Sequence, residues 1–247
     1  MNLYSSLPAT GPLTSSLGHA LLTLSETSST DAEAYSRYYE GDHFLPVGMN
    51  TPWVLAGRRW EGEPGYTRAG GFADDAARTT RRWFFAAYWV ASGRLDDAKN
   101  WLAAANARTS AERRVFVDRI PILTSFADFI GSRRKQDFPV DSFALMDPTR
   151  ALTVEVVDDP HDSGPQRLLD RAARVVETVE SVSAVLIFRE SNTGGGLLRY
   201  VLLWFLDADP GDHRPSVGEV SRMADDGFRV QVLATLAPRR MGVGIVE

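Results

Sequence analysis

The sequence predicts an α+β protein in which two tandem ferredoxin-like β-α-β-β-α-β halves pack sheet to sheet as a pseudo-dimeric α/β barrel. Two observations carry this prediction. Strand and helix patterns follow one another in the order β-α-β-β-α-β, and the same order then repeats within one chain. An antiparallel sheet with its helices on one face leaves the other face apolar, and a second sheet of the same kind covers it.

The first half begins with a strand and a helix that carries polar and aromatic residues. Weak alternation over residues 19–25 predicts the strand. Thr30 and Glu33 have the spacing of a capping box, which predicts a helix that starts there. We expect this helix to run to about Leu45 and to end at Pro46, because proline breaks the helical hydrogen-bond ladder.

The rest of the first half supplies three strands and a helix. Aromatic residues favour the pleated surface of a strand, and an apolar face at helical spacing favours a helix. Pro121 predicts an edge position or a bulge in the last of these strands. The expected segments are a strand over 53–60, a long loop over 61–80, a strand over 82–90, a helix over 94–106 and a strand over 115–124.

The second half repeats this order with a more aliphatic helix. Pro165 follows Gly164 at the first helical position of a second capping box, and an apolar stripe runs from Leu168 to Val179. The expected segments are strands over 151–157, 182–189, 198–206 and 228–236, with a short helix over 215–226 before the last strand.

These repeats divide the chain into three parts. Residues 1–130 form an N-terminal ferredoxin-like half that carries the candidate site, 131–149 a linker, and 150–247 a structural C-terminal half. Because an unpaired half would expose a large apolar sheet face, we expect one chain to close its own barrel. A homodimer would then form through an outer surface.

Composition excludes several classes of protein. The chain has 247 residues, 44% of them hydrophobic, and a net charge of −5, so it has no basic surface for nucleic acid. Cysteine is absent, which excludes disulfides, thiolate metal sites and a cysteine nucleophile. The longest apolar run, Tyr200–Leu206, is too short to cross a bilayer, and the first residues lack the pattern of a secretory signal. We therefore expect a cytoplasmic protein with no membrane partner.

The first helix is the most informative segment for function. Tyr35, Tyr39 and His43 are spaced i, i+4, i+8 and form one stripe, while Tyr38 and Asp42 form a neighbouring pair. A histidine can give or take a proton near neutral pH, and a tyrosine hydroxyl can hold a substrate oxygen. The structural alternative stays open. In that interpretation His43 complements the helix dipole, and the tyrosines pack at the edge of the core.

This helix and the strand after it resemble a known family. The stretch Tyr35–Pro46, followed by Trp53–Trp60, is similar to the EthD-like members of the dimeric α/β-barrel superfamily. There an aromatic-rich first helix ends in an acidic residue, a histidine and a nearby proline, and the next strand often ends in a basic and an aromatic residue. The second half lacks the motif. The superfamily includes cofactor-free monooxygenases, muconolactone-isomerase-like enzymes, polyketide cyclases and dehydratases, and haem-binding relatives, so the resemblance implies a fold more than a reaction.

Further side chains are candidates for substrate binding. His19 opens the first strand and would reach the cavity of His43 if its face of the strand pointed into the barrel. Some polyketide cyclases of the superfamily that the sequence resembles carry a histidine on this strand. The alternative is that His19 is exposed to solvent at the start of the strand. On the second and third strands, large aromatic residues surround small ones, which leaves room for a flat ligand, although core packing explains the aromatics equally well. Arg59 is placed to anchor a carboxylate or phenolate, or is solvated at the strand end. The candidates for substrate binding are His19, Tyr38, Asp42, Arg59, Trp60, Trp83 and Phe85.

The leading hypothesis is an enzyme that acts on a hydrophobic, aromatic or polyketide-like small molecule by acid/base chemistry. His43 would transfer the proton in a dehydration, cyclisation or isomerisation, and Tyr39 or Tyr35 would polarise an oxygen. The alternatives are a cofactor-free monooxygenase of a phenolic substrate, and a non-catalytic binding or scaffold protein. We expect neither a metal site nor a cofactor, except that haem stays open because one histidine ligand would suffice for it. The loop 61–80 is long enough to serve as a lid.

Overall fold

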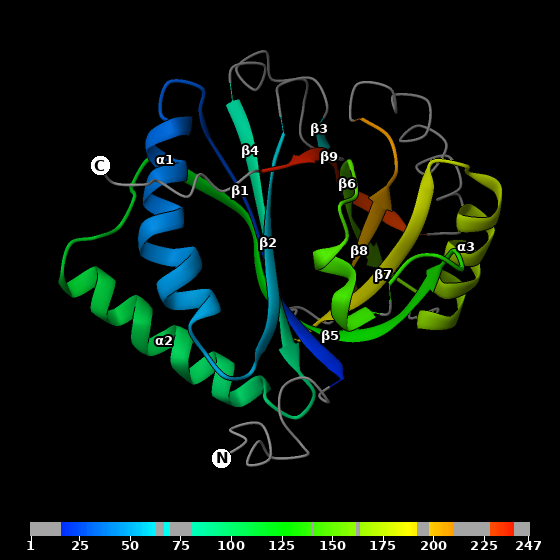
Figure 1. Ribbon diagram of the computed structural model, residues 1–247, viewed down its shortest axis with the longest axis horizontal. Coiled ribbons are helices and arrows are strands. Elements are labelled where there is room, and N and C mark those ends of the chain that lie inside the picture. Colours follow the sequence, from blue (N-terminus) through cyan, green and yellow to red (C-terminus); the bar gives the residue numbers. More distant parts are fainter. Residues whose placement is uncertain are drawn as a thin grey trace, which may run out of the picture.

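A computed structural model gives the structure of the chain, and it describes residues 16–62, 67–69, 81–139, 141–161, 164–191, 198–209 and 228–239. The described strands form one antiparallel sheet that closes on itself, with helices outside it (Figure 1). The elements are β1 (Leu17–Ser28), α1 (Ala32–Tyr38), the π-helix η3 (Tyr39–Met49), β2 (Val54–Gly62), β3 (Thr67–Ala69), β4 (Arg81–Ala91), α2 (Leu95–Ala111), β5 (Arg119–Arg134), the 3₁₀-helix η5 (Asp141–Met146), β6 (Ala151–Asp159), α3 (Pro165–Thr178), β7 (Val182–Glu190), β8 (Leu198–Leu206) and β9 (Arg229–Pro238).

The strand order confirms the predicted fold class. The first half has the order β2-β4-β1-β5 and the second half the order β7-β8-β6-β9, so corresponding strands occupy corresponding places. β5 pairs with β7, and β2 pairs with β9 at Trp60–Pro238 and Glu61–Ala237, which closes an eight-stranded barrel. The two halves are therefore hydrogen-bonded along both edges in addition to packing across the interior, and closure leaves their shared edges paired.

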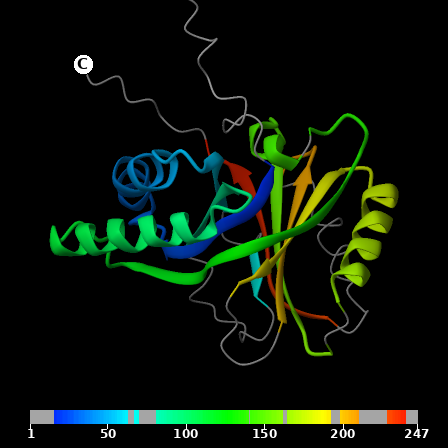
Figure 2. The ribbon, with the colours of Figure 1, turned by 90° about the horizontal axis from the view of Figure 1, so that it is seen from below.

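The helices cover opposite sides of the barrel. α1, η3 and α2 lie on the outer face of the first half, and α3 lies on the outer face of the second half (Figure 2). The barrel interior is a separate core to which both halves contribute, including the rings of Trp89 and Phe188, whose centroids are 5.2 Å apart. Each sheet face is thus buried, one against helices and the other inside the barrel.

The first helix is longer than predicted, because Pro46 does not end it. The chain changes from an α-helix to a π-helix at Tyr39 and continues through Pro46 to Met49. Proline has no N–H to donate, and a π-helix has already left the i→i−4 ladder that proline would break. The predicted capping box is also absent. Asp31 is the cap residue, and its side chain accepts a hydrogen bond from Ser28 instead of bonding the helix.

β5 lies further along the chain than predicted, because it pairs with both halves. It runs over Arg119–Arg134 and bonds β1 with its first part and β7 with its second. Pro121 stands where the register with β1 shifts, between Leu24 and Ser25, so the predicted bulge is confirmed. The segment expected as a linker, 131–149, begins with the end of β5 and contains η5, whose Ala144 and Leu145 are buried in the barrel core.

Some expected segments lie outside the described residues. These are most of the loop 61–80, of which the structure describes 61–62 and the strand β3, and the short helix expected over 215–226. Among the residues that the structure does describe, no helix is both long and apolar enough to cross a membrane.

Candidate active site

A cavity of about 60 Å³ lies between the outer face of the first sheet and the helices that cover it. It is bounded by β1, β4 and β5 on the sheet side and by η3 and α2 on the helix side. Polar and apolar groups share its surface, as in most sites that bind small molecules. Its lining residues are Leu21, Thr23, Tyr39, His43, Val47, Gly48, Tyr88, Leu102, Asn106, Arg119 and Thr124. We call it the polar cavity.

Three hydroxyl groups from three elements meet at the wall of the polar cavity. The Tyr88 hydroxyl donates a hydrogen bond to the Tyr39 hydroxyl at 3.2 Å, and the Tyr39 and Thr23 hydroxyls lie 3.1 Å apart. Burial, followed by the neighbouring Tyr39, raises the pKa of Tyr88 well above its ordinary value of 10.0. Tyr88 is therefore a neutral donor, and the Tyr39 hydroxyl proton is left for Thr23 or for a substrate oxygen.

His43 lies one helical turn after Tyr39 and faces the same cavity. Its Nδ1 is 3.5 Å from the Tyr38 hydroxyl, and its ring centroid is 5.7 Å from that of Tyr39. Burial lowers the pKa of His43 below 6.5, and the positive charge of Arg119 lowers it further, while Asp42 partly offsets both. The imidazole is therefore neutral near neutral pH, which is the form that accepts a proton.

Arg119 brings a positive charge to this cavity from the start of β5. Its charge lowers the pKa of His43 and acts in the same direction on Tyr35 and Tyr38. Within the part of the chain that the structure describes, its guanidinium has no carboxylate partner. A half-buried guanidinium with no ion pair to a described residue favours a ligand that carries, or develops, negative charge.

The other predicted residues of the first helix support the site from outside the cavity lining. The Tyr35 hydroxyl is bonded to Ser25 Oγ at 2.8 Å, and its ring packs on Phe84 at 4.9 Å. The Tyr38 hydroxyl donates to the backbone oxygen of Arg114 at 3.1 Å. Asp42 forms an ion pair with Arg114, and its charge reaches His43 through space.

Arg59 and His19 are both held by carboxylates, away from the cavity. Arg59 is buried, donates to Glu40 Oε1 at 2.7 Å and lies 4.7 Å from the centre of the Tyr39 ring, so it stands behind Tyr39. His19 Nδ1 lies 2.9 Å from Asp128 Oδ1. His19 shares the helix-side face of β1, although it does not line the polar cavity.

The aromatic candidates of β2 and β4 face the opposite side of the sheet. Trp60, Trp83 and Phe85 are buried in the barrel core, with the rings of Trp60 and Phe85 5.7 Å apart. The room expected above the small residue Gly57 is also filled, because a Cβ there would lie 2.3 Å from Met49 Sδ. Alternation along each strand explains the separation, since successive side chains point to opposite faces.

Several cavity residues were not among the sequence candidates. The additional polar ones are Thr23, Tyr88, Asn106, Arg119 and Thr124. Alternation on β4 separates Tyr88 from Trp83, Phe85 and Trp89, which was the available signal, but it does not say which face carries the helices. The nearness of Arg119 to His43 depends on strand pairing between segments far apart in sequence, and no local pattern encodes it.

The described residues offer little to a bound metal ion. They contain no group of three or more histidines, cysteines or carboxylates able to hold a metal ion.

Comparison with known proteins finds similarity only among solved structures, and that similarity is distant. No family model matches the sequence, and no curated protein matches it. Among solved structures, an anthrone oxidase-like protein is 12% identical, with 91% of this chain and 92% of that chain covered and a TM-score of 0.49. A chlorite dismutase from Candidatus Nitrospira defluvii has 10% identity, 92% and 94% coverage and a TM-score of 0.48. A proposed monooxygenase from Fusobacterium nucleatum has 11% identity, 90% and 95% coverage and a TM-score of 0.45.

Proposed function

We propose that this chain is an enzyme that takes a proton from a small hydroxy-aromatic or enolisable substrate bound in the polar cavity. The observation that carries the proposal is the pairing of His43 and Arg119 in one cavity. His43 is a neutral base because burial and Arg119 lower its pKa. The same arginine is positioned to hold the oxyanion that proton removal creates, which is the charge a catalytic site must stabilise.

Each polar group then has a distinct role. His43 accepts the proton from the substrate hydroxyl or from the carbon beside its carbonyl. Arg119 lies opposite the developing negative charge. Tyr39 accepts a hydrogen bond from Tyr88 and so can direct its own proton to the substrate oxygen. Return of the proton from His43 to a different atom completes an isomerisation, and its delivery to a leaving hydroxyl completes a dehydration.

Cofactor-free oxygenation of a phenolic substrate is the second candidate. It begins with the same proton abstraction, because the electron-rich anion is the form that reacts with dioxygen. The positive charge of Arg119 favours this anion as well, so the two candidates share their first step. They differ in whether dioxygen is consumed.

The proposal is tested with 4-nitrophenol, whose phenolate is coloured. We expect the wild-type protein to bind it and to lower its pKa, and Arg119→Gln to lose that shift. Arg108→Gln is the matched control, because it removes the same charge from an exposed position on α2 where Arg108 pairs with Glu112. If Arg119→Gln shifts the pKa of 4-nitrophenol as much as the wild type does, the anion site is wrong. An oxygen electrode, run with substrates that turn over, then separates oxygenation from isomerisation.

A further inference from the structure

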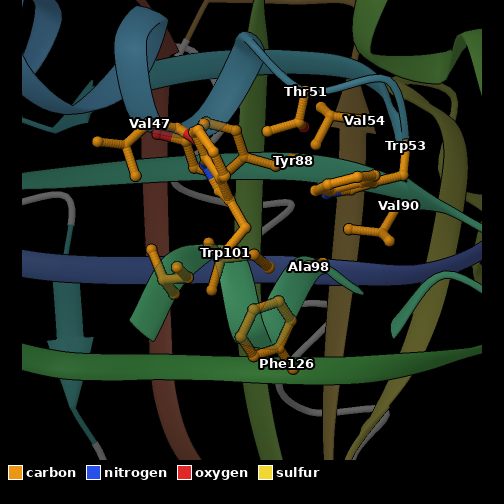
Figure 3. Close-up of a pocket in the computed structure, with 12 residues that line it drawn as sticks. Val47, Thr51, Trp53, Val54, Tyr88, Val90, Ala98, Trp101 and Phe126 are labelled. Carbon is orange, nitrogen blue, oxygen red and sulfur yellow. The ribbon is translucent and has the colours of Figure 1, made fainter. Parts of the chain in front are cut away.

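A second cavity, of about 20 Å³, adjoins the polar one and has a different surface. Figure 3 shows aromatic and aliphatic side chains converging on it from η3, β4, β5 and α2. We call it the apolar cavity. Its lining residues are Leu21, Val47, Gly48, Thr51, Trp53, Val54, Tyr88, Val90, Ala98, Trp101, Leu102 and Phe126.

The two cavities are neighbours because they share part of their walls. Both are lined by Leu21, Val47, Gly48, Tyr88 and Leu102. Tyr88 contributes to both in different ways. Its hydroxyl is bonded to Tyr39 beside the polar cavity, while its ring is part of the apolar cavity (Figure 3).

The lining of the apolar cavity suits a hydrocarbon group of a ligand. The indole N–H of Trp101 is already bonded to the backbone oxygen of Val47 at 2.8 Å, and the Tyr88 hydroxyl is bonded to Tyr39. The Thr51 hydroxyl is buried and has no hydrogen-bond partner among the described residues, so it offers one polar contact. Water needs two to four polar partners in such a space, whereas an alkyl group or ring edge needs none.

We infer that the apolar cavity receives the hydrocarbon end of the substrate while its acidic oxygen lies between His43 and Arg119. This inference rests on the proposed function and narrows the substrate class to hydroxy-aromatic compounds with a short alkyl extension. Ala98 sets how long that extension can be. It is buried on the cavity side of α2, so a longer side chain at this position fills the space.

The experiment measures the affinity of a series of 4-alkylphenols by calorimetry. In the wild type, each added methylene that is buried strengthens binding about fourfold, which is the effect of about 0.8 kcal/mol, until the cavity is full. Ala98→Leu removes this dependence on chain length and leaves phenol itself bound as in the wild type. Ala104→Leu makes the same substitution on the exposed face of α2 and keeps the dependence.

The outcomes separate this inference from the proposed function. If phenol binds to the wild type but longer alkylphenols bind no more tightly, the inference is wrong and the proton-abstraction site stands. If Ala98→Leu keeps the wild-type dependence on chain length, the hydrocarbon end lies elsewhere, and the inference is again wrong. If no phenol binds, the proposed function falls, and this inference falls with it. Ala98→Val, which adds less volume, replaces the leucine variant if that variant does not fold, and we expect it to shorten the series that fits.

Discussion

Gly48 of η3 lies directly on the ring of Tyr88. A Cβ at position 48 would lie 2.0 Å from Cε1 of Tyr88, closer than real side chains ever approach. The π-helix can therefore rest on this ring only where it carries glycine. Tyr88 and Gly48 line both cavities, so this contact lies where the two cavities adjoin.

Gly48→Ala is expected to destabilise the protein by about 1–3 kcal/mol, the usual cost of overpacking a filled region. Gly41→Ala is the matched control, because Gly41 is in the same π-helix and a Cβ there meets nothing within 4 Å. Replacing a helical glycine that has open space stabilises by about 0.5–1 kcal/mol. Urea denaturation measures both changes. Equal effects of the two substitutions would show that the contact with Tyr88 carries no energy.

Tyr39→Phe is expected to destabilise the protein more than Tyr88→Phe does. Tyr39→Phe leaves the buried Tyr88 hydroxyl without the acceptor it has at 3.2 Å, and an unsatisfied buried donor costs about 1–3 kcal/mol. Tyr88→Phe removes that donor and leaves Tyr39 bonded to Thr23 at 3.1 Å. Thermal and urea unfolding of the two variants test this order, which the reverse ranking would contradict.

His43→Ala is expected to lose about 10²–10⁴-fold in rate while the fold stays intact. His43 is only half-buried, and its hydrogen bond with the Tyr38 hydroxyl is long, at 3.5 Å. Removal of the imidazole therefore costs the Tyr38 hydroxyl only a weak hydrogen bond, and that hydroxyl keeps its bond to the backbone oxygen of Arg114. Circular dichroism and turnover of an identified substrate are measured together. A variant that unfolds would assign His43 a structural role, and a folded variant with full activity would place the proton transfer elsewhere.

The pH dependence follows from the lowered pKa of His43. Only the neutral imidazole accepts a proton, so kcat/KM falls as the pH drops through a pKa that lies below 6.5. Asp42→Asn removes a charge that raises this pKa, so the acid limb moves to lower pH. Arg119→Gln removes a charge that lowers it, so the limb moves to higher pH. NMR titration of the His43 ring gives the same pKa without a substrate, and shifts in the same direction for both variants would contradict the assignment.

Stability should depend on pH in a related way. The folded state holds His43 with a lowered pKa, so the unfolded state binds the proton more readily. Above about pH 6.5 the imidazole is neutral in both states, and His43 costs the folded state nothing. As the pH drops below 6.5 the unfolded state takes up the proton first, so the free energy of unfolding falls. His43→Gln cannot titrate, and we expect it to lose this part of the pH dependence in urea unfolding.

Glu40→Ala is expected to destabilise the protein by about 3–5 kcal/mol, because it leaves buried Arg59 without its carboxylate. The same Glu40 oxygen accepts a hydrogen bond from Arg239 at 2.8 Å, so the substitution also removes one of the bonds that tie the end of β9 to the first half. Asp97→Ala is the control, because its pair with Arg94 is exposed, and it should change stability by less than about 1 kcal/mol. A small effect of Glu40→Ala would show that Arg59 finds water or another partner.

Local patterns in the sequence predicted every described strand except β3, and they predicted the helices α1, α2 and α3. Alternation and aromatic content located β4 within one residue at each end, and the repeated order of elements led to the barrel. The end of the first helix was predicted wrongly at Pro46. A local rule treats proline as a helix terminator, whereas packing of η3 on the sheet allows a π-helix that contains it.

The residues of the candidate site also fall into those that local spacing predicted correctly and those that it did not. The spacing of Tyr39 and His43 placed both on one face of their helix, and both line the polar cavity. Spacing did not reveal which strand face lies beneath them, so Trp60, Trp83 and Phe85 were grouped with a cavity on the other side of the sheet. One residue of slip or one choice of face reverses every side chain of a strand, and the sequence of that strand does not contain the choice.

Sequence alone determined the order of the barrel strands and of the helices α1, α2 and α3, and which helix carries a base and hydroxyl groups. Tertiary structure alone decided which side chains from other strands lie beside that base, His43. The register of β1 places Leu21 opposite Tyr88 on β4 and Thr23 opposite Thr124 on β5, and the same pairing brings Arg119 to the cavity of His43. The physical reason is that backbone hydrogen bonds between distant segments set this register, and they bring together side chains that no local spacing relates.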